Sequence, residues 1–182
     1  EPCKVNETVE FIGTHDVCSY IISGEDVLVV GCGMSHATPA LERQLSRMRI
    51  DPARVKYALV THSHFDHCGA VPYFRQRFPH LQVLGAAAAQ EALAKPKVAA
   101  YNAQMNDLAA QQAQVYDQCL HLSDCPSALR IDRIVSEGDI LDLGRGVVVR
   151  FYEARDHFCR LAARRCYRCT TALKRRATFL KC

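Results

Sequence analysis

Three histidines and one aspartate are crowded into six positions of this chain, directly after an apolar run. The run is "VKYALV", residues 55–60, and the cluster that follows it is His62, His64, Asp66 and His67. Neutral imidazoles and carboxylates are the ligands that zinc, iron and manganese use in proteins. Three imidazoles this close would repel one another when protonated, and a bound cation removes that cost. The spacing H-x-H-x-D-H therefore predicts a metal site.

The segments before the cluster predict strands and one helix. Three short runs are rich in β-branched and aromatic residues and are separated by turn residues, which predicts antiparallel strands at residues 9–14, 16–23 and 26–31. Residues 36–50 carry apolar side chains at helical spacing, with Thr38 as the expected cap. The apolar run before the cluster is typical of a strand covered on both faces.

The chain after the cluster predicts helices and then strands again. A stretch rich in Ala, Gln and Leu at residues 86–115 predicts one or two helices, with a break near residues 94–97. Short strands are expected at residues 81–85, 131–137, 139–144 and 147–154. This order indicates an α/β fold in which sheet packs against helices in α+β layers. The cluster would then follow the carboxyl end of a buried strand, where such proteins place their sites.

A longer stretch around the cluster resembles the signature of the metallo-β-lactamase superfamily. It reads "ALVTHSHFDHCGAVPYF", residues 58–74. The similarity covers about residues 8–153, because "YIISGEDVLVVGCGMS" and "EGDILDLGRGVVVRFYEA" also fit the pattern of that family. The resemblance implies an αββα sandwich of the metallo-β-lactamase type, which we expect to be incomplete in its second half.

The resemblance also implies a metal-dependent hydrolase and gives each member of the cluster a role. His62 and His64 would bind one metal ion, and Asp66 and His67 would bind a second. We expect one or two zinc ions, with iron or manganese as alternatives. A bound metal lowers the pKa of water from 15.7 to about 7, so that hydroxide can attack an ester, a thioester or a similar small substrate. Asp66 is the expected catalytic residue, because it would orient that water.

Two positions depart from the family pattern. Gly31 stands where family members commonly carry an aspartate that supports the metal loop, which puts the orientation of the ligands in question. In the segment "ARDHFC", His157 is in register to complete the first metal site, but the proline and the glycine of the family's turn are missing. Because of this register, we expect His157 as the fifth metal ligand even without that proline and glycine.

The last residues differ sharply from the rest. Residues 154–182 hold nine Lys or Arg and one acid, a net charge of +8, so the preceding residues carry −4 of the total of +4. We predict a partial metallo-β-lactamase-like domain at residues 1–153 and an atypical basic, cysteine-rich tail at residues 154–182. Either the tail is a functional appendage, or a break in the reading frame has removed the second half of the domain, which we favour. A functional tail would bind nucleic acid, or a metal through Cys159, Cys166, Cys169 and Cys182.

Composition bounds the remaining expectations. No apolar run reaches the roughly 18 residues of a membrane span. The first residues do not resemble a secretory signal and the ten cysteines are scattered, so we expect a cytoplasmic protein with no membrane partner. The expected partner is a small-molecule substrate, and nucleic acid is expected only if the basic tail binds it. The alternatives to an active hydrolase are a degenerate, non-catalytic metal-binding domain, a nucleic-acid-processing relative and a diiron redox relative.

Overall fold

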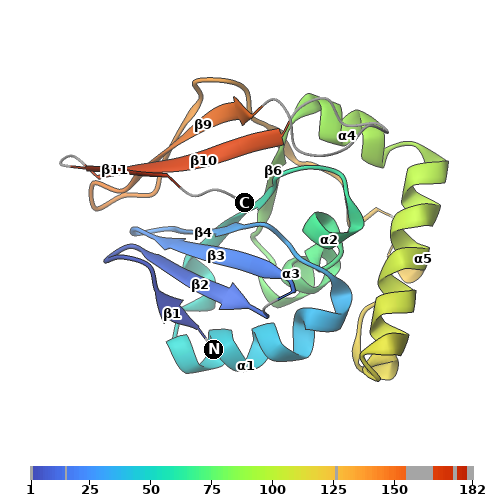
Figure 1. Ribbon diagram of the computed structural model, residues 1–182. Helices are drawn as coiled ribbons and strands as arrows, with labels where there is room; N and C mark the ends of the chain where they lie inside the picture. Colours follow the sequence, from blue (N-terminus) through green and yellow to red (C-terminus); the bar gives the residue numbers. More distant parts are fainter. Residues whose placement is uncertain (1, 15, 126, 155–165, 174–175, 180–182) are drawn as a thin grey trace.

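The fold consists of two stacked sheets with helices around them. The computed structural model describes residues 2–14, 16–125, 127–154, 166–173 and 176–179, and from residue 154 onward only the backbone is described. A seven-stranded sheet has the order β1-β2-β3-β4-β5-β6-β7, and a four-stranded sheet has the order β11-β10-β9-β8. Figure 1 shows the second sheet stacked over one face of the first, with helix α1 against the opposite face. The expected layered α/β fold is confirmed.

The first half of the large sheet is antiparallel. The three strands predicted before the first helix all form, and a short edge strand precedes them: β1 (Cys3–Lys4), β2 (Val9–Gly13), β3 (Cys18–Ser23) and β4 (Val27–Val30). Each residue of β4 is fully buried, because this strand lies at the centre of the sheet. Its apolar side chains therefore pack on both faces.

The second half of the large sheet is parallel and places the cluster. Strand β5 (Val55–Val60) pairs with β4, β6 (Gln82–Gly85) pairs with β5, and β7 (Arg133–Ile134) pairs with β6. Because parallel strands end at the same edge of a sheet, the connections after β4, β5 and β6 meet there. The cluster begins two residues after β5, at this edge.

The helices follow the predicted segments, with one local correction. Thr38 is the first residue of α1 (Thr38–Met48) and not its cap, since Ala37 occupies the cap position and the Thr38 hydroxyl donates to the Ser35 carbonyl at 2.7 Å. The Ala-rich stretch forms two helices, as expected. These two are α4 (Ala87–Leu93) and α5 (Pro96–Gln112), and α2 (Phe65–Cys68) and α3 (Val71–Arg77) precede them. Single 3₁₀ turns are η1 (Ser35–Ala37), η2 (Pro52–Arg54), η3 (Tyr116–Gln118) and η4 (Leu122–Asp124).

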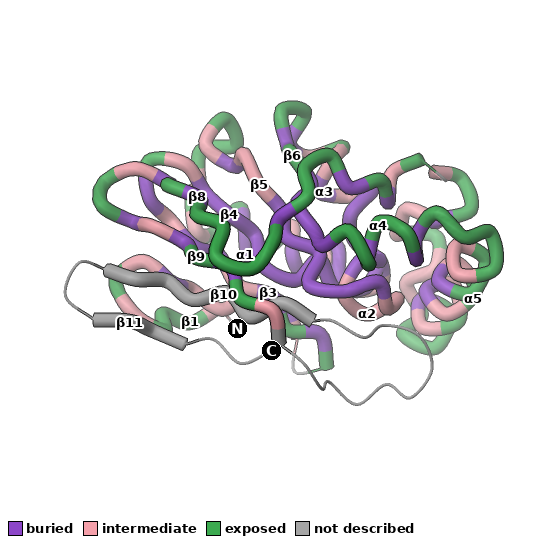
Figure 2. Tube along the Cα trace, turned by 90° about the horizontal axis from the view of Figure 1, so that it is seen from above, coloured by how far each residue is buried: buried purple, intermediate pink, exposed green. Residues whose placement is uncertain are grey.

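The second sheet closes the core from the other side. Strands β8 (Ile140–Asp142) and β9 (Val148–Ala154) form a hairpin, and β10 (Cys166–Leu173) and β11 (Arg176–Phe179) extend it. Leu141 and Phe151 belong to the same buried cluster as the strands of the large sheet. Figure 2 shows the buried residues gathered along the central strands, whereas much of α5 is exposed. Within the described residues, no helix combines the length and apolar character needed to cross a lipid bilayer. The boundary predicted at residue 153 stays a prediction.

Candidate metal centre

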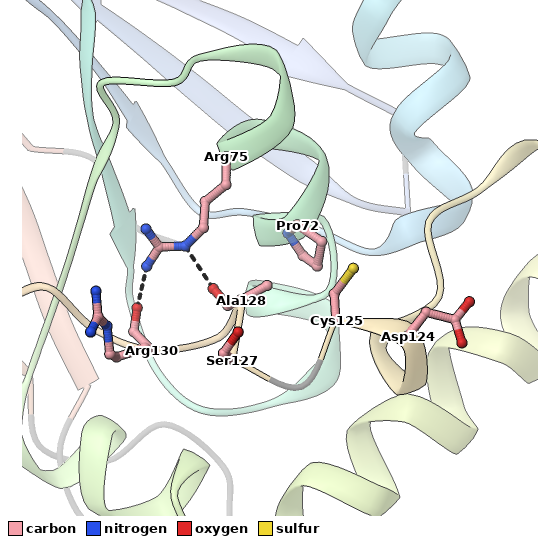
Figure 3. Close-up of a pocket in the computed structure, with 7 residues that line it drawn as sticks. All are labelled: Pro72, Arg75, Asp124, Cys125, Ser127, Ala128 and Arg130. Atoms are coloured by element: carbon pink, nitrogen blue, oxygen red, sulfur yellow. Dashed lines mark hydrogen bonds between the residues drawn. The ribbon is translucent and has the colours of Figure 1, made fainter.

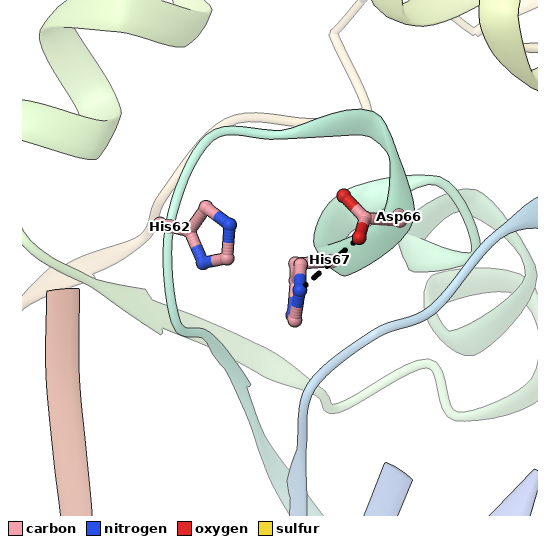
Figure 4. A group of neighbouring side chains, drawn as sticks. All are labelled: His62, Asp66 and His67. Carbon is pink, nitrogen blue, oxygen red and sulfur yellow. Dashed lines mark ion pairs between the residues drawn. The ribbon is translucent and has the colours of Figure 1, made fainter. Parts of the chain in front are cut away.

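A tight turn after β5 brings the cluster together. The chain leaves β5 in an extended conformation, and His64 caps the single turn α2 with φ −74° and ψ 150°. The His67 amide donates to the His64 carbonyl at 3.0 Å, and the Gly69 amide donates to the Phe65 carbonyl at 3.1 Å. This fold-back places Asp66 and His67 beside His62, as Figure 4 shows. We call residues 61–69 the metal loop.

The side-chain atoms lie at distances that suit shared metal ions. His62, Asp66 and His67 each offer one ligand atom, and these atoms lie within 4.8 Å of one another. His62 Nε2 lies 3.1 Å from His64 Nδ1, and His67 Nε2 lies 3.3 Å from an oxygen of Asp66. Two ligands of one tetrahedral zinc ion, each at roughly 2.0–2.1 Å, are about 3.3 Å apart. The donor set therefore fits zinc in both chemistry and spacing.

The electrostatics keep the carboxylate of this cluster ionised. Burial alone would raise the pKa of Asp66, but the hydrogen bond and charge of His67, with a smaller contribution from His62, hold that pKa below its ordinary value of 3.8. The Asp66 side chain is 45% exposed and that of His67 is 22% exposed, whereas His62 is buried. The cluster therefore has one buried side and one side open to solvent, from which water and a substrate can approach.

Comparison with known proteins places the chain in a family. The sequence model of the metallo-β-lactamase superfamily matches residues 13–158. The chain belongs to the metallo-β-lactamase superfamily. The resemblance seen in the sequence is thereby confirmed.

Solved metallo-β-lactamases share the fold at low sequence identity. A variant enzyme from Cronobacter sakazakii matches with a TM-score of 0.73 and 16% identity, covering 100% of this chain and 63% of its own. FEZ-1 from Legionella gormanii matches with a TM-score of 0.69 and 17% identity, covering 95% of this chain and 58% of its own. BJP-1 of Bradyrhizobium japonicum, a subclass B3 enzyme, matches with a TM-score of 0.66 and 16% identity, covering 98% of this chain and 60% of its own. The chain thus spans about three-fifths of each of these proteins and has the fold of metal-dependent hydrolases.

Within this metallo-β-lactamase fold, Thr61 is a site residue that the sequence reasoning missed. Its buried hydroxyl lies 3.3 Å from Nδ1 of His62 and 3.3 Å from Nδ1 of His67. A partner at Nδ1 fixes the orientation of an imidazole and leaves Nε2 directed at the metal. The available signal was a hydroxyl residue between the end of a buried strand and the first histidine.

Two buried thiols, Cys68 within the metal loop and Cys32 after β4, have sulfurs that donate to backbone carbonyls. Cys68 is buried, and its sulfur donates to the His64 carbonyl at 3.1 Å. Burial, together with Cys32 and Asp66, raises the pKa of the Cys68 thiol, and burial raises the pKa of Cys32 to about 12. Burial therefore favours the protonated form of both thiols in the metal-free chain.

The connection after β4 supports the metal loop through its backbone. Gly31 has a φ of +75° and donates to the Leu59 carbonyl at 3.0 Å. The Cys32 amide donates to the His67 carbonyl at 3.1 Å, and the Cys32 carbonyl accepts from the Ala70 amide at 3.0 Å. His157, the expected fifth ligand, lies outside the described residues, so its role stays a prediction.

A separate pocket shares no lining residue with the cluster. It has a volume of about 580 Å³ and is lined by Pro72, Arg75, Asp124, Cys125, Ser127, Ala128 and Arg130 (Figure 3). The Arg75 guanidinium donates to the Ala128 carbonyl at 2.8 Å, to the Arg130 carbonyl, and to Asp132 at 2.8 Å. Because this cation already holds the surrounding chain, we assign it a structural role.

Proposed function

We propose that this chain provides the metal loop of a metal-dependent hydrolase that acts on an ester, a thioester or a similar small molecule. The observation that carries the proposal is the pairing of donor atoms, 3.1 Å between His62 and His64 and 3.3 Å between Asp66 and His67. Both separations match two adjacent ligands of one tetrahedral ion. Membership of the metallo-β-lactamase superfamily supports the same chemistry.

The residues of the metal loop would have separate roles. His62 and His64 would hold a first ion, which His157 would complete, and Asp66 and His67 would hold a second. Zinc bound there, or iron or manganese, would supply activated water at neutral pH and polarise the bond under attack. The Asp66 carboxylate, ionised at neutral pH, would accept a hydrogen bond from the attacking water and aim it. Thr61 would keep both Nε2 atoms directed at the metal.

We further propose a small-molecule substrate and a cytoplasmic location. The described cysteines Cys3, Cys18, Cys32, Cys68, Cys119 and Cys125 are all free thiols, which a reducing compartment maintains. Retention of the thiols in the chain extracted under non-reducing conditions, measured by alkylation, tests the location. Disulfide formation among them would contradict it.

The metal proposal is tested by a double variant. The change His62→Ala with His64→Ala removes two of the three proposed ligands of the first ion, so the zinc bound per chain should fall by at least half. Elemental analysis after dialysis against a weak chelator measures this. His80→Ala serves as the control, because His80 is exposed and outside the metal loop. Equal zinc in the double variant and the unmutated chain would contradict the proposal.

A further inference from the structure

Two amide side chains are buried beneath the metal loop. Asn102 is 1% exposed and Asn106 is 0% exposed, and both belong to α5. Residues four apart share one face of a helix, so the two amides form a polar stripe on the buried face. Burying an amide is unfavourable unless its hydrogen bonds are made. The hydrogen-bond partners of these two side chains therefore indicate the role of the stripe.

The amides bind carbonyl groups on both sides of a metal-ligand candidate. Asn102 Nδ2 donates to the Ser63 carbonyl at 3.1 Å, and Asn106 Nδ2 donates to the Phe65 carbonyl at 3.4 Å. Asn106 Nδ2 also donates to the Asn102 carbonyl at 2.9 Å, which ties the stripe to its own helix. The peptide units that join Ser63 to His64 and Phe65 to Asp66 are thereby attached to α5. Figure 1 shows α5 running alongside α2.

Asn106 also connects the metal loop to the connection after β4. Its Oδ1 accepts from the Ser35 amide at 2.9 Å, across 71 residues of sequence. A Cβ atom at Gly69 would overlap the Asn106 side chain, so this approach requires a glycine at the end of the metal loop. One side chain thus joins three segments that surround the candidate ligands.

We propose that Asn102 and Asn106 are positioning residues of the metal centre. They hold the carbonyls of residues 63 and 65 against α5 and so fix the direction in which the His64 imidazole and the Asp66 carboxylate leave the backbone. The metal-binding part of this inference rests on the proposed function. Hydrogen-bond partners behind metal ligands typically contribute 10–100-fold to metal affinity.

The test exchanges a buried amide for a carboxylate of the same shape. Asn102→Asp removes the donor to the Ser63 carbonyl, and Gln104→Glu makes the same chemical change at an exposed position of α5. Co²⁺ titration, followed by visible absorption at neutral pH, should show affinity about tenfold weaker in Asn102→Asp, with an altered spectrum, and unchanged in Gln104→Glu. Equal affinity and equal spectra in both variants would overturn the proposal.

A second measurement uses the unmutated chain, in case Asn102→Asp does not fold. Because Asn106 links the Ser35 amide to the metal loop, hydrogen exchange at Ser35 should slow when Zn²⁺ is added. Unchanged exchange at Ser35 with Zn²⁺ bound would overturn the proposal.

The failure of the proposed function is distinguishable from the failure of this inference. If the unmutated chain binds neither metal, the proposed function fails. Exchange in the metal-free chain then decides the inference, through the amides of His67 and Gly69, which bond within the metal loop. Faster exchange of these amides in Asn102→Asp than in Gln104→Glu supports positioning by α5, and equal exchange overturns it.

Discussion

Thr61 shows how a single hydroxyl at the end of a strand serves two imidazoles. The change Thr61→Val keeps the shape of the side chain and removes the group that lies 3.3 Å from each Nδ1. Without it the two rings lose their fixed orientation, and we expect zinc affinity to fall about tenfold. Competition with a chromophoric chelator measures this, and Thr61→Ser should restore most of the affinity. Equal affinity in the valine and serine variants would contradict this role.

His36 should make the stability of the fold depend on pH. Burial lowers the pKa of His36 below its ordinary value of 6.5, against the smaller opposite effect of Asp16, and its buried Nδ1 has no hydrogen-bond partner within the described residues. As the pH falls below 6.5, His36 therefore takes up a proton in the unfolded chain before it does so in the folded chain. The stability contributed by neutral His36 is present above that pH and is lost as the pH falls toward the folded-state pKa.

Urea unfolding at a series of pH values measures this effect of His36. The midpoint should fall between about pH 7 and pH 5, and it should fall less in His36→Gln, which cannot take up the proton. The same slope in both proteins would assign the pH dependence to other groups.

At the scale of elements, local pattern was enough for the strands and helices that bury one continuous set of side chains. The central strand β4 is wholly apolar and α1 has one apolar face, so both were predicted near their true positions. Pairing was not predictable in the same way. The segment 131–137 was expected to be a strand, but only its partner β6 places β7 in the large sheet. That partner lies 49 residues earlier and leaves no local signal.

The candidate site was likewise predictable from the sequence only in its local part. The spacing of the candidate ligands is local, since one turn of chain brings His62, Asp66 and His67 together, and the sequence therefore indicated them. The supporting groups come from other elements. Asn102 and Asn106 lie in a stretch rich in Ala, Gln and Leu, where hydropathy does not separate a buried polar face from an exposed one. Only the packing of α5 against the metal loop reveals their role.

Arg75 joins α3 to the segment that leads into β7. Its guanidinium donates to the Ala128 carbonyl and to Asp132, whose carboxylate also accepts from the Val83 amide at 2.8 Å. The change Arg75→Ala leaves the Ala128 carbonyl without this donor and removes one of the donors to Asp132, and we expect the free energy of unfolding to fall by about 2 kcal/mol. Urea denaturation measures it. The exposed Arg47→Ala is the control and should change stability by less than about 0.5 kcal/mol. Equal losses in both variants would contradict this structural role.

At the scale of the whole molecule, we expect the number of ligands to limit activity. The first ion could have His62, His64 and His157, whereas the second could have Asp66 and His67, and residues 158–182 offer no further His, Asp or Glu. The chain also covers only 63%, 58% and 60% of the solved metallo-β-lactamases that share its fold. A catalytic dinuclear site needs enough protein ligands to fix both ions and still leave room for water.

We therefore expect one tightly bound ion per chain and hydrolysis at least about 100-fold weaker than in a chain extended by the remaining part of a metallo-β-lactamase domain. The reason is positional, because a loosely held second ion and its water lose the alignment on which the attack depends. Metal content by elemental analysis and turnover of a chromogenic thioester, measured on both chains, check the two halves of this expectation. Asp66→Asn in the extended chain should abolish turnover, which would assign the recovered activity to this metal loop. Two bound ions and full turnover in the 182-residue chain would instead show that residues 154–182 supply ligands of their own.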